Sequence, residues 1–186
     1  MSAARWAVLG AVALVFAPAL GGEFVWDDVI LIRDNPAVHG LGAAWGAAWG
    51  DFFGSAAGQP QGGYLRPVPT LLNGLTWAAV AADPLVYHLQ NLALHLGAVA
   101  LLMAVAGRLG ASGLAAAAAG AVFGLHPRQV EAVAFISGRT DLLAAVGVLG
   151  ATWLHLRARR GGGPWTVVAA WAALVFGALS KEVALL

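Results

Sequence analysis

Five apolar runs alternate with polar stretches along the chain, and each has the composition of a membrane-spanning helix. The runs cover residues 6–20, 85–107, 109–125, 141–156 and 165–179. A span needs about 20 mostly apolar residues, so the shorter runs lie at the lower end of the usual range. We therefore predict an all-α fold, a polytopic membrane helix bundle with about five spans.

A long interval, residues 23–84, separates the first two runs, and residues 23–67 of it contain no apolar run of membrane length. Within it, residues 41–49 place Trp45 and Trp49 at helical spacing with little charge nearby. Tryptophan favours the boundary between bilayer and water, so this segment is expected to form a short helix on the membrane surface.

Residues 68–82 are apolar and helical in pattern but short for a span. If they do not cross, all nine acids fall on the outer side, and the inner side is marked by Arg5, Arg108, Arg157, Arg159 and Arg160. If they cross, the last three arginines lie outside, against the positive-inside tendency. We therefore predict that residues 23–84 form a first outer loop carrying interfacial helices.

The first apolar run follows Arg5 and contains Ala-Pro-Ala at 17–19, which also fits a cleaved signal peptide. Several further spans follow it, and a retained helix with its N-terminus inside is therefore favoured.

Composition supports a membrane protein with a single domain over residues 1–186. The chain is 60% hydrophobic and 10% charged, against about 45–50% and about 25% in globular proteins. It has no cysteine, which excludes disulfides and thiolate metal sites. Its few bases are divided between two membrane faces, so nucleic-acid binding has no support.

Charged side chains converge on the predicted outer side. They are Asp27, Asp28, Arg66, His126, Glu131, Arg139, Asp141, Lys181 and Glu182. Ionisable groups at a membrane edge are costly unless they are paired, hydrated or in use. Such a set suits a reaction in which a carboxylate accepts a proton while cations stabilise a departing anion.

Six short motifs in register resemble the transmembrane and tetratricopeptide-repeat O-mannosyltransferases and their bacterial relatives, which are C-type glycosyltransferases. The motifs are FVWDD at 24–28 with NP at 35–36, YLRP at 64–67, YHLQN at 87–91 with His95, HP at 126–127 with EAV at 131–133, GRTDLL at 138–143 and LSKE at 179–182. The resemblance covers nearly the whole chain.

The resemblance implies a membrane glycosyltransferase that moves a sugar, mannose by family, from a polyprenyl-phosphate donor to a protein Ser or Thr hydroxyl. It implies an integral multi-pass protein of the bacterial inner (plasma) membrane with an outward-facing site. Asp27 and Asp28 match the acidic pair that supplies the catalytic base or a metal ligand, and Asp28 is weakly preferred as the base. Lys181 resembles a basic position that meets the lipid phosphate, together with Arg139 and Arg66.

A divalent metal is compatible with this assignment but not required by the sequence. Paired acids suit Mg²⁺ or Mn²⁺, and the candidate ligands are Asp27, Asp28 and Asp141. Family members continue with further spans, so this chain resembles an N-terminal portion. A non-catalytic or truncated membrane scaffold is the main alternative. A transporter is disfavoured because the span interiors hold almost no ionisable groups.

Several of the site residues also have a purely structural interpretation. The acidic pair at 27–28 could cap a helix, and Glu131 could pair with Arg128 three residues earlier. His126 and its following proline fit a helix start.

Two further polar pairs also fit helix ends. Thr140 and Asp141 fit a capped helix N-terminus. Lys181 and Glu182 could anchor the end of the last helix by pairing with neighbouring charges.

Overall fold

Helices are the only regular elements among residues 2–54 and 62–186, the part of the chain that the computed structural model describes. The long helices are α1 (Ala3–Phe16), α3 (Pro67–Val80), α4 (Pro84–Arg108), α5 (Gly113–Gly124), α7 (Arg139–Ala158) and α8 (Pro164–Ala178). The shorter ones are η1 (Ala17–Gly21), η2 (Val29–Arg33), η3 (Pro36–Val38), α2 (Leu41–Ala47), α6 (Gln129–Ala134), η4 (Ile136–Gly138) and η5 (Glu182–Leu185).

Every predicted apolar run contains a helix, and the all-α prediction is confirmed. The two segments predicted to lie on the membrane surface form α2 and α3. Within the described residues, two stretches, Ala3–Gly21 and Pro84–Arg108, are long and apolar enough to cross a membrane, while α5 and α8 are shorter apolar helices. The count of five spans and the surface position of α2 and α3 stay predictions, and residues 55–61 of the predicted outer loop lie outside the described part.

Local sequence signals fix the ends of several helices. The Asp83 side chain accepts a hydrogen bond from the backbone N–H of Leu85, and Pro84 occupies the first turn of α4. Ser112 caps α5 in the same way, through the backbone N–H of Ala115. These two N-caps therefore fix where α4 and α5 begin.

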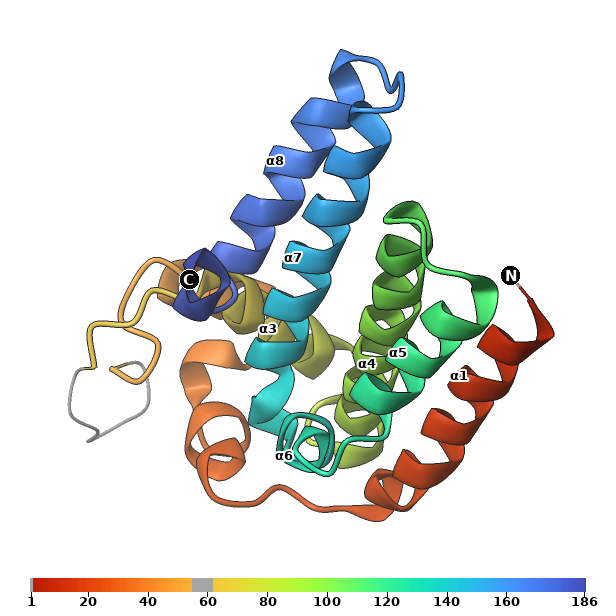
Figure 1. Ribbon diagram of the computed structural model, residues 1–186. Coiled ribbons are helices and arrows are strands. Elements are labelled where there is room, and N and C mark those ends of the chain that lie inside the picture. Colours follow the sequence, from red (N-terminus) through yellow and green to blue (C-terminus); the bar gives the residue numbers. More distant parts are fainter. Residues whose placement is uncertain (1, 55–61) are drawn as a thin grey trace.

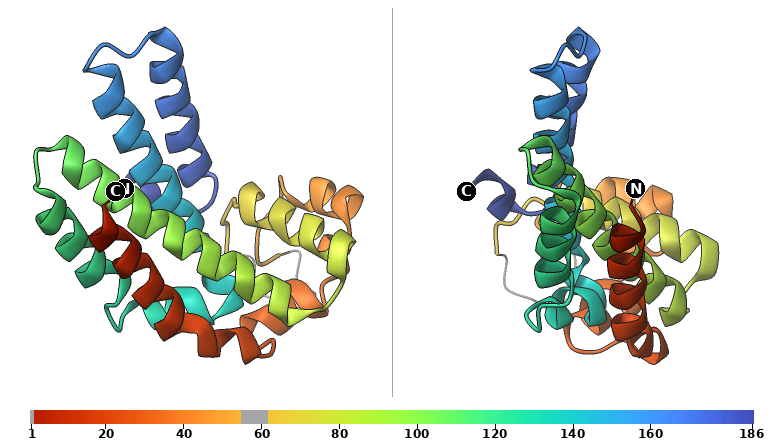
Figure 2. Two further views of the ribbon diagram at one scale, coloured as in Figure 1. Left: turned by 90° about the vertical axis from the view of Figure 1, so that its right-hand side faces the viewer. Right: turned by 45° about the vertical axis from the view of Figure 1, so that its right-hand side comes forward.

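The helices form two connected groups, seen in Figures 1 and 2. Helices α1, α4 and α5 lie side by side, and α7 packs along both α4 and α8. The α7–α8 hairpin extends away from the rest of the chain. A Cβ atom at Gly147 would lie 2.5 Å from the Cα of Gly177, so α7 and α8 approach at a pair of glycines.

The two ends of α7 differ in charge. At its C-terminal end, the Arg160 side chain donates a hydrogen bond to the carbonyl of Arg108. The guanidinium of Arg108 lies 4.8 Å from the ring centre of Trp153. At the other end of this 20-residue helix, about 30 Å away, lie the acids of the predicted site. The bases predicted to be inside therefore gather at one end of the bundle.

Candidate functional site

A cavity of about 150 Å³ lies at the N-terminal end of α7. Five of the charged residues that the sequence singles out line it: Asp27, Arg66, Glu131, Asp141 and Lys181. Asp27 lies in the loop after η1, Arg66 directly before α3 and Glu131 in α6. Asp141 lies in the first turn of α7, and Lys181 directly precedes η5. The fold thus brings together residues from both ends of the sequence.

Lys181 and Asp141 form an ion pair at the mouth of this cavity. The ammonium nitrogen of Lys181 lies 2.8 Å from each carboxylate oxygen of Asp141. Both side chains are partly exposed, at 26% for Lys181 and 46% for Asp141. An incoming anion can therefore reach the lysine, because the pair is open to solvent.

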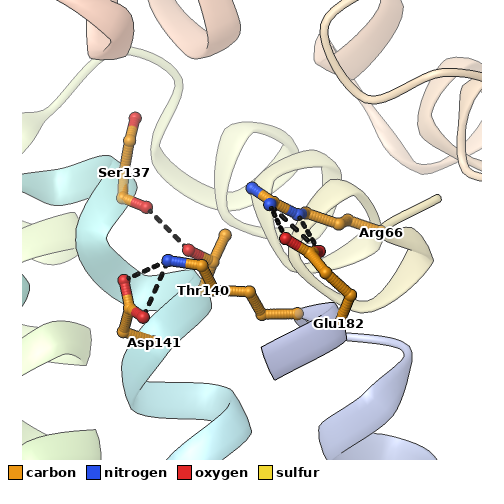
Figure 3. A network of polar contacts seen from close by, with 6 residues as sticks. Arg66, Ser137, Thr140, Asp141 and Glu182 are labelled. Atoms are coloured by element: carbon orange, nitrogen blue, oxygen red, sulfur yellow. Dashed lines mark hydrogen bonds and ion pairs between the residues drawn. The ribbon is translucent and has the colours of Figure 1, made fainter. Parts of the chain in front are cut away.

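Arg66 and Glu182 form a second ion pair beside the first, shown in Figure 3. The Arg66 guanidinium donates to both oxygens of Glu182, with N···O distances between 2.7 and 3.1 Å. Arg66 is buried and also lies 4.8 Å from the ring centre of Tyr64, whereas Glu182 is half exposed. The hydrogen bonds from Arg66 hold the pKa of Glu182 below its ordinary value.

These two pairs confirm the structural interpretation of the segment after α8. Lys181 and Glu182 each pair with a charge from a distant segment. The backbone N–H of Val68 also donates to the carbonyl of Leu179 at 3.3 Å. The end of α8 is therefore fixed both to α7 and to the start of α3, while both cations still line the cavity.

The adjacent acids Asp27 and Asp28 occupy different environments. Asp28 is fully buried, and one of its oxygens accepts from the backbone N–H of Ser137 at 2.7 Å and from its hydroxyl at 2.6 Å. Its other oxygen accepts from the N–H of Val25 at 3.2 Å. Asp27 is half-buried and lines the cavity. Trp26, just before them, has φ of 47°, a left-handed value that is unusual for a bulky residue.

Arg139 lies away from the cavity, although the sequence suggested an anion-binding role. It is 1% exposed. Its guanidinium donates to the side-chain oxygens of Asn73 and Gln90 and to the backbone carbonyls of Tyr87 and Ile136. With its donors used inside the protein, Arg139 joins α3, α4 and α7 beneath the site.

Sequence reasoning missed the residues that support this interior network. Ser137, Asn73 and Gln90 each bond to a charged group, yet none was singled out as a site residue. The available signal was a polar amide within an otherwise apolar helix, as at Asn73 in α3.

Glu131 in α6 and His126 and Arg128 in the turn before it are exposed. Glu131 lines the small cavity and two neighbouring ones, of about 250 and 780 Å³. No ion pair joins it to Arg128 among the described residues, so that alternative is wrong. His126 lines none of these three cavities, and its Nδ1 accepts from the backbone N–H of Arg128 at 3.1 Å, which fits the helix-start interpretation.

The capping interpretation of Thr140 is also wrong. Helix α7 begins at Arg139 and has no side-chain cap. The Thr140 hydroxyl donates to the carbonyl of Ser137 at 3.4 Å, because the 3₁₀ turn η4 runs directly into α7 (Figure 3). Asp141 does lie in the first turn, where its charge suits the helix dipole.

A metal at Asp27, Asp28 and Asp141 stays a prediction from the sequence, and two of these acids already have partners within the protein. Among the described residues, no group of three His, Cys, Asp or Glu side chains is placed to hold an ion. The oxygens of Asp28 accept hydrogen bonds from protein donors, and those of Asp141 are bonded to Lys181. We therefore assign no step to a metal.

Comparison with known proteins identifies relatives over most of the chain. Protein O-mannosyl-transferase Tmtc2 of Drosophila melanogaster is 39% identical over 184 residues, 92% of this chain and 19% of the relative. Tmtc1 of the same species is 43% identical over 45% of the chain and 10% of the relative. Human protein O-mannosyl-transferase TMTC1 is 36% identical over 74% of the chain and 16% of its own length. No protein-family model and no solved structure matches.

These alignments confirm the resemblance that the six motifs indicate. The chain spans at most about a fifth of the length of these curated relatives, which are 19%, 10% and 16% covered.

Proposed function

This chain belongs to the TMTC family of protein O-mannosyl-transferases, and on that premise we propose that it provides a mannosyl-transfer site. The donor is a polyprenyl-phosphate mannose, and the acceptor is a Ser or Thr hydroxyl of a protein. The observation that carries the proposal is that the carboxylate of Asp27 and the cations of Arg66 and Lys181 line one and the same cavity.

The reaction needs a base on one side of the sugar and cations on the other. Asp27 accepts the proton of the acceptor hydroxyl, and the resulting oxygen nucleophile bonds to the anomeric carbon. The bond from that carbon to the phosphate oxygen breaks, and its electron pair leaves with the lipid phosphate. Because the nucleophile attacks opposite the leaving group, the anomeric configuration inverts.

Lys181 and Arg66 stabilise the departing phosphate in this proposal. Each now bonds to a carboxylate, and the lipid phosphate would compete with Asp141 and Glu182 for these donors as it gains negative charge on leaving the sugar. The pair with Lys181 is more exposed, so Lys181 is the first contact. Arg66, held over aromatic rings, supplies a second, more rigid donor.

The two acids have different roles in this proposal. Asp27 is the base because it lines both the small cavity and the adjoining space of about 780 Å³, which would receive the acceptor. Asp28 is buried and bonded to Ser137, so it is a positioning residue that fixes the turn carrying Asp27. Arg139, equally buried, positions the start of α7 and with it Asp141.

The site faces the outer side of the membrane in this proposal, with the arginines at the C-terminal end of α7 inside. The positive-inside tendency supports this orientation, because Arg108 and Arg160 lie at that end. The relatives that match come from animals, and the bacterial inner membrane stays a prediction from the motifs.

The test is transfer of radiolabelled mannose from polyprenyl-phosphate mannose to membrane protein. Membranes carrying the chain within its full reading frame are compared with Asp27→Asn and Lys181→Gln forms. We expect each substitution to lower transfer by about 10²-fold or more, as for loss of a general base or of a transition-state cation.

Asp34→Asn is the matched control, because Asp34 is an exposed acid of the same loop that pairs with Arg33. It should keep full transfer. Unchanged transfer in Asp27→Asn at normal expression would contradict the assignment of the base.

A further inference from the structure

A groove between α7 and α8 lies toward the arginine-rich end, away from the polar cavity. It measures about 680 Å³, within the size range of ligand sites. Its walls are mostly apolar and include Val148, Val167, Trp171 and Leu174. Trp171 is 65% exposed, so the groove presents a large aromatic surface that the described part of the chain leaves open.

Two basic side chains at the C-terminal end of α7 also line this groove: His155 in the last turn and Arg159 directly after the helix. His155 and Arg159 are four residues apart, so they lie on one face of the helix, and both are exposed. No carboxylate in the described residues pairs with Arg159. The groove therefore joins an apolar channel to an unpaired positive charge.

The neighbouring arginines point to other partners. The guanidinium of Arg157 lies 5.7 Å from the ring centre of Trp153, and the Arg160 side chain donates to the carbonyl of Arg108. Neither arginine lines the groove. Arg159 is thus distinguished from its neighbours by its place at the groove.

We propose that this groove binds an anionic phospholipid, with an acyl chain between α7 and α8 and the headgroup phosphate at Arg159 and His155. Charge complementarity selects this occupant, because a neutral lipid would leave Arg159 without a counter-charge and a free phosphate would leave the apolar walls uncovered. Basic pockets between membrane helices on the inner side bind anionic headgroups in this way. The proposal depends on α7 and α8 lying in the bilayer but not on the transfer reaction.

The test is native mass spectrometry of the full chain in detergent, titrated with phosphatidylglycerol or phosphatidylcholine of identical acyl chains. We expect several-fold tighter binding of phosphatidylglycerol. Arg159→Gln should weaken that binding about fivefold, the usual contribution of one basic residue near a headgroup. Arg157→Gln, its matched control two residues away, should leave it unchanged.

A second variant tests the apolar part of the groove. Ala151→Phe fills the groove without altering any charge, and it should weaken binding of both lipids. Circular dichroism checks that the variants keep their helix content. Equal binding of the two lipids, equal loss in Arg157→Gln and Arg159→Gln, or displacement of phosphatidylglycerol by millimolar inorganic phosphate would each overturn the proposal. No sugar donor is present, so the result is independent of transferase activity.

Discussion

At the N-terminal end of α7, Arg66 and Lys181 are each held by a carboxylate from a distant segment. At its C-terminal end, Arg157 and Arg159 have no carboxylate partner among the described residues. One helix therefore separates a region of paired charge from a region of unpaired positive charge. The difference shows that the cations near the predicted catalytic cavity join distant segments through carboxylates, whereas those at the other end contact only an aromatic ring or a backbone carbonyl, or line the apolar groove.

The paired region is organised around a buried layer as well as its surface pairs. Arg139 and Asp28 lie beneath the cavity, and their hydrogen bonds join α3, α4, the loop before η2 and the start of α7. The arginine-rich end has no comparable layer among the described residues, because none of their buried polar side chains comes from residues 141–179. Substitutions should therefore have unequal effects at the two ends.

The largest expected effect is that of Arg139→Met. The change removes the four hydrogen bonds of the buried guanidinium and leaves the side-chain oxygen of buried Asn73 without its donor, so it should lower the free energy of unfolding by about 3 kcal/mol or more. Arg157→Met at the other end should alter it by less than about 0.5 kcal/mol. Reversible unfolding in mixed micelles compares the two. Similar losses in both would remove the distinction between the ends.

A smaller effect is expected for Gly147→Ala in the hairpin. The added Cβ would lie 2.5 Å from the backbone of Gly177, so the helices must separate, at a cost of about 1–3 kcal/mol. Gly150→Ala, one turn along α7, meets only an ordinary contact of 3.9 Å with Ala173 and should be neutral or slightly stabilising. The same unfolding assay applies, and equal effects would argue against close packing at Gly147.

The sequence predicted the helices well because apolar runs and caps are local signals. The runs at 85–107 and 165–179, for example, correspond to α4 and α8. The ion pairs within the site could not be predicted from the sequence, because Arg66 and its partner Glu182 are 116 positions apart. Only the packing of α3 against the end of α8 brings them together.

The roles of individual charges were also hidden from the sequence. Asp27 and Asp28 are adjacent residues of the same type, yet Asp27 lines the cavity and Asp28 is buried. The left-handed backbone at Trp26, directly before them, could not be predicted from the sequence. Arg139 was predicted to bind an anion. The sequence does not show that the side-chain amides of Asn73 and Gln90, from two other helices, accept its hydrogen bonds instead. Such distinctions depend on three-dimensional contacts.

Asp28→Asn should affect stability more than Asp27→Asn does. An amide has one acceptor oxygen in place of two, so at least one of the bonds from Ser137 and Val25 is lost, at about 1–2 kcal/mol. Asp27 lines the cavity and accepts no buried hydrogen bond within the described part of the chain, so its substitution should change the free energy of unfolding by no more than about 0.5 kcal/mol. Thermal unfolding of both variants tests this, and a larger loss for Asp27→Asn would reverse the proposed roles.

The smallest expected effect concerns pH and the pair of Arg66 with Glu182. Hydrogen bonds from Arg66 lower the pKa of Glu182 in the folded chain from its ordinary 4.5, so the folded state favours the ionised form. The stabilisation is therefore fully present above about pH 4.5 and is lost as pH falls through the lowered folded value. Half of the Glu182 side chain is exposed, so solvent screening keeps the effect small.

The measurement is unfolding stability from pH 7 to pH 3 for the parent chain and for Glu182→Gln. The difference between them should stay constant down to about pH 4.5 and shrink below it. Asp34→Asn is the control, because its pair with Arg33 is fully on the surface and joins adjacent residues. A difference that instead grows on acidification would mean that the carboxylate of Glu182 destabilises the fold, and the paired end of α7 would then owe its stability to the buried layer alone.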